Sequence, residues 1–287
     1  MVNGDEIQYR VQDHQHDAQA LGTKSDHAVG RTYALKPAGS GSKHPQIEKG
    51  SSTPSTLDLR KNPNIPAILD QGQLGSCAAN AMANVLTFRM GCAGRGVFHP
   101  SRLALYYNCR VSVEKSPADE DTGVTIEDMC KSVKHFHAGH EYLWPYDVSK
   151  FAQAPPAAET KDAGKYVSFA YEPVNQRVDA IKQSLVAGFP VILGIQVYDS
   201  FESQAVAETG IVPMPDTSKE QCQGGHAQAL YGFDDTKQAF LSMNSWVSVS
   251  LVYVRECMHL TSATVTAGKF LGAQGVQLDP VRVHHQP

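Results

Sequence analysis

The stretch DQGQLGSCAANAMANVLTFRM, residues 70–90, predicts an irregular loop that leads directly into a buried helix. Gly72 and Gly75 permit a tight backbone path, because a residue without Cβ adopts backbone angles that are forbidden to other residues. Ser76 stands where a helix N-cap belongs. Apolar side chains then recur at helical spacing up to a terminating glycine: Ala78, Ala81, Met82, Val85 and Phe88, followed by Gly91. Cys77 is therefore expected in the first turn of this helix.

This position favours chemistry at the sulfur of Cys77. The thiolate is the nucleophilic form of cysteine, and a helix N-terminus, which carries roughly +0.5 of a charge, lowers the thiol pKa. His226 follows a glycine pair at the head of an apolar run, QGGHAQALYGF, that predicts a strand. Asn244 ends a second short strand, FLSMNSW. Cys, His and Asn in this order supply a nucleophile, a base and a group that orients the base.

Three segments together point to a known family. The loop that ends in Cys77, the glycine-preceded His226 and the Asn-Ser-Trp that begins at Asn244 resemble the signature blocks of papain-like cysteine peptidases, with similar spacing. The resemblance implies that Cys77 is the nucleophile, His226 the general base and acid, and Asn244 the group that orients the imidazole. It also implies that Gln71 and the Cys77 N–H form the oxyanion hole. Trp246 matches the indole that shields the His–Asn hydrogen bond from water.

The resemblance covers roughly residues 56–256. The segments LDLRKN, PSRLALYYNCR, DTGVTIEDM, EYLWPYD, GFPVILGIQVYDSF and TGIVPMP look like the compact non-lysosomal members found in bacteria and large DNA viruses. This implies an α+β, two-lobed papain-like fold with the active-site cleft between the lobes. The helical lobe is expected at about 70–160 and the β-rich lobe at about 165–256, in keeping with helices first and strands second.

Substrate contacts are expected from two glycines and from Trp246. Gly123 matches the family's glycine whose backbone pairs with an extended substrate beside the second subsite, a contact that makes no demand on side chains. The alternative is that Gly123 only ends a loop. Gly225, directly before His226, indicates a roomy or uncharged site.

The chain departs from the family pattern at two places. Most members continue Asn-Ser-Trp with a glycine, whereas Val247 follows here in NSWVSVSLVYV, which implies a rebuilt turn. Secreted members carry a disulfide-forming cysteine three residues before the nucleophile. Leu74 occupies that position, so this disulfide is not expected.

Further elements follow from local patterns. Helical periodicity marks three segments: 99–108, 126–136 and 175–190. Ser101 is the expected cap of the first, and Thr125 with Asp128 indicates a capping box for the second. PVILGIQVY predicts a buried strand. APPAAETKDAGK is expected to be a connecting stretch between the lobes.

Composition limits the partners and the compartment. The 287 residues are 41% hydrophobic and 19% charged, with a formal net charge of −4, so no footprint for nucleic acid or an anionic membrane is expected. No apolar run reaches the ~18 residues that a membrane span needs. The six cysteines lack short paired spacing and the N-terminus lacks a signal-peptide pattern, which predicts free thiols in a cytoplasmic or other reducing compartment. A monomer is the expected state.

A metal site is an alternative interpretation of HFHAGH. His135, His137 and His140 are residues of the type that ligates zinc. However, their spacing places His135 and His137 on different helix faces, and no cysteine or carboxylate cluster completes the set. The sequence therefore predicts neither a metal nor an organic cofactor.

The two ends of the chain carry weaker signals. Residues 1–55 are polar and rich in Gly, Ser, His and Gln, which fits either a disordered tail or a propeptide that plugs the cleft. Their least polar part, RTYALKP at 31–37, is expected to pack on the body or into the cleft. Residues 257–287 are expected to form a clasp or to remain partly loose.

The predicted function is that of a cysteine endopeptidase acting on peptides or proteins. An alternative is a catalytically silent peptide-binding protein on the same fold, for which the altered NSWV segment is the motive. A second alternative makes Cys77 an inert core thiol, and a third makes the reaction an acyl transfer to an amine instead of water.

Overall fold

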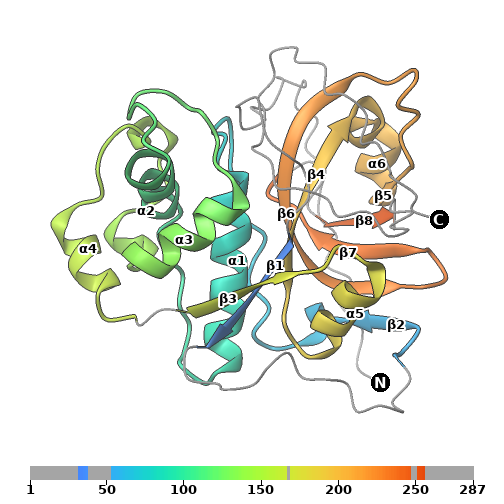
Figure 1. Ribbon diagram of the computed structural model, residues 1–287, viewed down its shortest axis with the longest axis horizontal. Coiled ribbons are helices and arrows are strands. Elements are labelled where there is room, and N and C mark those ends of the chain that lie inside the picture. Colours follow the sequence, from blue (N-terminus) through green and yellow to red (C-terminus); the bar gives the residue numbers. More distant parts are fainter. Residues whose placement is uncertain (1–31, 38–52, 167–168, 247–250, 256–287) are drawn as a thin grey trace, which may run out of the picture.

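The computed structural model describes residues 32–37, 53–166, 169–246 and 251–255. Helices α2, α3 and α4 gather on one side of helix α1, and most of the eight-stranded sheet lies on the other side together with α5 and α6 (Figure 1). The α-helices are α1 Cys77–Cys92, α2 Arg102–Tyr107, α3 Ile126–Phe136, α4 Ala157–Ala163, α5 Val178–Val186 and α6 Gln204–Thr209. Short 3₁₀ segments are η1 Leu59–Lys61, η3 Glu141–Leu143, η4 Val148–Lys150 and η5 Asp199–Glu202, and η2 Asn108–Val113 is π-helical.

The sheet is antiparallel except at one edge. Its strands are β1 Thr32–Pro37, β2 Thr56–Asp58, β3 Phe169–Val174, β4 Val191–Tyr198, β5 Ile211–Val212, β6 Cys222–Asp234, β7 Ala239–Met243 and β8 Leu251–Arg255. The spatial order is β3-β1-β4-β6-β7-β8-β5, with β2 paired to β6, and only the β5–β8 pair is parallel. The long β6 is thus a central strand of the sheet and also the strand against which α1 packs.

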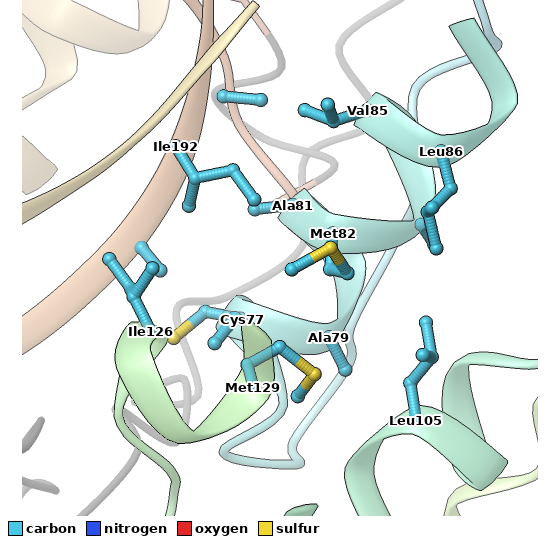
Figure 2. Packing of buried hydrophobic residues seen from close by; sticks show 14 of the residues in the cluster. Cys77, Ala79, Ala81, Met82, Val85, Leu86, Leu105, Ile126, Met129 and Ile192 are labelled. Atoms are coloured by element: carbon cyan, nitrogen blue, oxygen red, sulfur yellow. The ribbon is translucent and has the colours of Figure 1, made fainter. Parts of the chain in front are cut away.

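Helix α1 confirms the buried helix that the sequence predicts, with Cys77 as its first residue, but it does not end at Gly91 as expected and continues to Cys92. Nearly all its side chains are buried, because alanines allow α3 on one side and the sheet on another to approach closely. Figure 2 shows Cys77 and Met82 of α1 packed beside Ile126 and Met129 of α3. Fully burying large apolar side chains of this kind contributes roughly 1.5–3 kcal/mol each.

Ser76 holds the N-cap position of α1, as predicted. Its hydroxyl makes no capping bond to the helix. Instead, Ser76 Oγ lies 2.5 Å from Tyr146 Oη and accepts a hydrogen bond from Asn80 Nδ2 at 3.0 Å. The hydroxyl is thus directed toward the Tyr146 and Asn80 side chains and not toward the backbone N–H groups of the first turn.

The other predicted helix starts are confirmed. Ser101 accepts a hydrogen bond from the Ala104 N–H at 3.3 Å and caps α2. Thr125 accepts from the Asp128 N–H at 3.0 Å and caps α3. The reciprocal half of the expected capping box differs, because the Thr125 N–H donates to Glu114 at 2.8 Å rather than to Asp128. The helix of 175–190 is present as α5, and PVILGIQVY is present as β4.

Long-range contacts create elements that the local sequence does not predict. The expected connecting stretch APPAAETKDAGK contains α4. Two of its carboxylates accept backbone N–H groups from a distant loop, Glu159 from Gly139 at 2.7 Å and Asp162 from His140 at 3.0 Å. The short α6 and the strand β8 likewise lie in segments without a predicted element.

The segment 31–37 contributes a strand to the sheet. Tyr33 of β1 pairs with Pro173 of β3 and with Ile192 of β4, so β1 lies between these two strands. The segment therefore packs on the body of the molecule, one of the two placements expected from its sequence. Residues 1–31, 38–52 and 257–287, for which we predicted a plug or tail and a clasp, lie outside the described residues.

Cysteine pairing and membrane crossing can be assessed over the described residues. The five cysteines found there are free thiols: Cys77, Cys92, Cys109, Cys130 and Cys222. The expected free thiols are confirmed for these five, and Cys257 lies outside the described residues. None of the described helices has both the length and the apolar character that a bilayer crossing requires.

Candidate active site

The imidazole of His226 is held from two sides. His226 lies on β6, and Asn244 follows the paired strand β7 directly. His226 Nε2 lies 2.7 Å from Asn244 Oδ1, and the Trp246 ring stacks on the imidazole with ring centroids 4.3 Å apart. All three side chains are buried. The structure therefore brings these three predicted site residues together.

The proton on this imidazole can be assigned from its partner. Asn244 Oδ1 also accepts the Ser245 N–H at 2.8 Å, which identifies the facing amide atom as the oxygen. Nε2 of His226 must then donate to it, so the neutral imidazole carries its proton on Nε2. Nδ1 is left as the basic nitrogen, and it is buried with no hydrogen-bond partner among the residues that the structure describes.

Gln71 is held by hydrogen bonds to Ser245, the residue that follows Asn244. Its side-chain oxygen accepts the Ser245 hydroxyl at 2.6 Å, and its backbone N–H donates to the Ser245 carbonyl at 3.0 Å. Its Nε2 donates one hydrogen to the Leu74 carbonyl at 3.0 Å. An amide nitrogen carries two hydrogens, so one donor remains on Gln71 for another acceptor.

Cys77 lies where α1 meets β6, and its thiol is 1% exposed. Burial raises the pKa of the Cys77 thiol to about 11, although the backbone N–H groups of Ala227, Ala78 and Cys77 itself favour the thiolate. The lowered thiol pKa that we expected from the helix N-terminus is therefore wrong for this conformation. Loss of hydration outweighs the helix dipole here. Cys77 nevertheless packs in the same buried cluster as Ala227, the residue after His226 on β6.

The imidazole is neutral for the same reason. Burial lowers the pKa of His226 from 6.5 to about 4, and the hydrogen bond to Asn244 opposes this shift. At neutral pH the described conformation thus pairs a neutral thiol with a neutral base. An ion pair between them requires a change in their surroundings.

The low pKa of His226 predicts acid sensitivity. Between its ordinary value of 6.5 and about 4, the unfolded chain binds a proton that the folded chain excludes, so the free energy of unfolding falls as pH falls. From pH 7 to pH 5 the loss assigned to this residue is on the order of 2 kcal/mol. Urea unfolding at both pH values, in wild type and in His226→Gln, measures it. An equal pH dependence in both proteins would contradict the assignment.

The remaining predicted site residues lie on backbone features. Gly225 is buried on β6, opposite Gln196 of β4. Gly123 is buried in the loop before α3 with φ at +62°, a conformation that favours glycine. Its N–H donates to the Tyr106 hydroxyl at 3.0 Å. The side chain of Leu74, in the position of the absent cysteine, is buried in the core.

The three histidines of HFHAGH do not converge. His140 Nδ1 lies 2.8 Å from Asp162 Oδ2, and the Tyr166 hydroxyl lies 3.2 Å from the same nitrogen. Nowhere in the described part of the chain do three His, Cys, Asp or Glu side chains gather as metal ligands would. His140 joins α4 to the loop after α3.

The residues that hold the nucleophile loop, Tyr146 and Arg102, were not predicted from the sequence. The Tyr146 hydroxyl donates to the Gln71 carbonyl at 2.8 Å and also contacts Ser76. The Arg102 guanidinium lies over the Tyr146 ring, 3.9 Å from its centroid, and donates to the Asp70 carbonyl at 2.8 Å. The only sequence signal for these roles was the occurrence of Arg102 and Tyr146 in segments that resemble the family.

Comparison with known proteins decides the family. The sequence pattern that defines the papain family cysteine proteases matches residues 53–250, which is more than half of the chain. The chain belongs to the papain family of cysteine proteases. This confirms the resemblance drawn from the loop at Cys77, from His226 and from the Asn-Ser-Trp segment. The helices and the mixed sheet agree with the α+β papain-like fold expected from that resemblance.

Individual relatives agree with this membership. An uncharacterized peptidase C1-like protein of Acanthamoeba polyphaga mimivirus is 41% identical over 204 residues, 67% of this chain, and the match spans 65% of that relative's length. Xylellain, a cysteine protease from Xylella fastidiosa, is 26% identical with a TM-score of 0.67, over 89% of this chain and 100% of its own. A digestive procathepsin L of Tenebrio molitor, at 14% identity and a TM-score of 0.52 over 79% of this chain and 72% of its own, shares the fold.

Proposed function

We propose that this papain-family protein is a cysteine endopeptidase in which Cys77, His226 and Asn244 act together. The observation that carries the proposal is the orientation of His226. Asn244 and Trp246 hold the ring so that Nε2 is occupied and Nδ1 is the basic nitrogen. Cys77 packs in the same buried cluster as the next residue, Ala227, where α1 meets β6. An oriented base beside a thiol at a helix N-terminus fits nucleophilic catalysis.

The reaction then proceeds through an acyl-enzyme. His226 Nδ1 takes the thiol proton, and the Cys77 sulfur attacks the peptide carbonyl carbon. The Cys77 N–H and the remaining hydrogen of the Gln71 amide bind the oxyanion. The tetrahedral intermediate collapses as imidazolium protonates the leaving amine, which breaks the C–N bond. The neutral imidazole then deprotonates a water that attacks the thioester, and the proton returns to the sulfur as the acid leaves. The chemistry requires no metal or organic cofactor.

The burial of the thiol adds one requirement. With Cys77 1% exposed, a carbonyl carbon reaches its sulfur only after the surroundings of the site move. Water or substrate that enters then removes the desolvation that raises the thiol pKa. The described conformation is accordingly the resting form, and Gly123 with Gly225 would contact the substrate backbone once it enters.

The free thiols among the described cysteines support a reducing compartment. We take the monomer as the working oligomeric state.

The test is peptide-bond cleavage with product mapping. The purified, reduced chain is incubated with an unfolded protein, and the products are sequenced by mass spectrometry. Internal cleavages are expected. Products trimmed only at the ends would make the enzyme an exopeptidase, and a product joined to an added amine would make it a transferase.

A silent peptide-binding protein is the second candidate, and the motive for it is Val247, which follows Asn-Ser-Trp where most family members have glycine. Binding of a peptide without any cleavage over a broad pH range would support this candidate and overturn the first.

We also propose that the residues before β1 form a propeptide or cleft plug. Deleting residues 1–50 would remove β1 from the sheet, so the informative deletion is residues 1–31. A chain that begins at residue 32 is expected to turn over a small peptide faster than the full chain does. Equal kcat/KM for the two chains would contradict the plug.

A further inference from the structure

The loop between η2 and α3 has a fixed conformation without regular structure. Residues 115–125, which include Gly123, form no helix or strand, and Glu114 before them is the C-cap of η2. An isolated loop of this length would not hold one backbone conformation, because ordering each residue costs roughly 1–2 kcal/mol of conformational entropy. Side chains from outside the loop must therefore fix it, and most of them come from one helical face.

Three polar side chains at a spacing of four residues line that face: Tyr106, Arg110 and Glu114. Arg110 is fully buried and donates to loop carbonyls, at 2.8 Å to Pro117 and at 3.0 Å to Ala118. It also donates to the carbonyls of Glu120 and Phe151. Glu114 accepts the Thr125 N–H at 2.8 Å, where the loop ends in α3. Each of the three side chains thus contacts a different part of the loop.

Tyr106 connects this loop to the nucleophile loop. Its hydroxyl accepts the Gly123 N–H at 3.0 Å and donates to Asp121 Oδ1. The other oxygen of the same carboxylate, Oδ2, accepts the Gly75 N–H at 2.8 Å. Gly75 lies two residues before Cys77. A single carboxylate therefore joins the backbone before the nucleophile to the backbone at Gly123 through one phenol.

We propose that Asp121, oriented by Tyr106, is a positioning residue that sets the nucleophile loop at Gly75 and the substrate-binding backbone at Gly123 relative to each other. The pair contacts no reacting atom and acts through the two glycines. A half-buried carboxylate is suited to this role, because it accepts two N–H or O–H donors with defined geometry. The proposal rests on the proposed function in one respect, that Gly123 contacts substrate.

Charge and position predict opposite effects at Asp121, which makes the proposal testable. The carboxylate charge of Asp121 contributes to the raised pKa of Cys77, so removing that charge alone should favour the thiolate. Removing the hydrogen bonds should misplace the loops. A fall in kcat/KM on substitution of Asp121 would therefore come from position and not from charge.

Three substitutions test separately the contact of Asp121 with Gly75 and its contact, through Tyr106, with Gly123. Asp121→Ala removes both contacts and is expected to lower kcat/KM on the order of 10²-fold, the cost of a small misplacement of reacting groups. Asp121→Asn keeps one acceptor for the Gly75 N–H and should recover part of this loss. Tyr106→Phe keeps the Gly75 contact and is expected to raise KM for an extended peptide while kcat changes little. Asp119→Asn, which removes an exposed charge from the same loop, is the matched control and should behave as wild type.

Amide hydrogen exchange provides a measurement that does not depend on activity. Asp121→Ala should speed exchange in the peptides that cover residues 70–77 and 117–125. Tyr106→Phe should speed it only in 117–125, with the rest of the molecule as protected as in wild type. Wild-type exchange in both peptides of folded Asp121→Ala would overturn the positioning role, even if wild type proves inactive. If exchange becomes faster as expected but the wild type cleaves no peptide, the proposed function is wrong and the positioning role of Asp121 is supported. Unchanged kcat/KM in an active Asp121→Ala would also overturn the inference.

Discussion

Replacement of Cys77 by alanine is expected to abolish peptide hydrolysis. The sulfur is the only atom that we assign to bond formation with the carbonyl, so its loss removes the covalent route entirely. Removing a serine nucleophile from a protease triad lowers kcat by a factor on the order of 10⁶, and a loss of similar size is expected here. Turnover of a fluorogenic peptide by wild type and by Cys77→Ala measures the ratio.

Cys92→Ala is the matched control for this substitution. Cys92 is a free thiol at the far end of the same helix, and it is exposed. It should keep wild-type kcat and KM. Residual hydrolysis by Cys77→Ala that is above the uncatalysed rate and unaffected by further purification would remove Cys77 from the reaction.

Replacement of Gln71 by alanine is expected to have the next largest effect, a loss in kcat on the order of 10²–10³. Ser245 holds the amide oxygen, so the nitrogen is presented in one orientation with a hydrogen to spare. The hydrogen bond from the Gln71 amide stabilises the oxyanion most strongly in a site from which water is excluded. The effect should fall on kcat rather than KM, because the bond strengthens only as charge develops on the oxyanion.

Two variants test the orientation separately from the donor. Ser245→Ala keeps the Gln71 amide but removes the hydroxyl that fixes it, and a loss nearer to tenfold is expected. Gln71→Glu replaces the donor by an acceptor of the same shape and should be at least as damaging as Gln71→Ala. If Gln71→Ala kept kcat within a factor of about three, the Gln71 amide would not be an oxyanion donor.

Features encoded by local patterns were predictable from the sequence. The alanine-rich run after Cys77 indicated a helix buried on all sides, and α1 is one. The apolar runs around His226 and before Asn244 indicated strands, and their pairing as β6 and β7 brings the two side chains together. In each case, the periodicity and the end signals lie within a single element.

Features set by distant contacts were not predictable. Ser76 has the right residue type and position for a cap, yet Tyr146, 70 residues away, takes its hydroxyl. The short helix α4 depends on hydrogen bonds to the loop after α3. The predicted sign of the Cys77 pKa shift was wrong because burial, a property of the whole fold, outweighs the helix terminus.

The link through Asp121 illustrates the same limit within the candidate site. Asp121, Tyr106 and Gly75 come from three separate segments, and no local pattern marks their contact. The spacing of Tyr106, Arg110 and Glu114 by four residues was visible in the sequence. Its meaning depends on a loop whose path only the fold defines.

The most direct test of the account is reaction of the folded, reduced protein with an epoxysuccinyl probe, read by intact mass and peptide mapping. One adduct per chain is expected, on Cys77, and it should form in the folded protein but not in the unfolded chain or in His226→Gln, because the base on β6 supplies the reactivity. The exposed thiol of Cys92 should remain unmodified. No adduct in the folded protein, or an adduct on Cys77 that forms equally well without His226, would contradict the account.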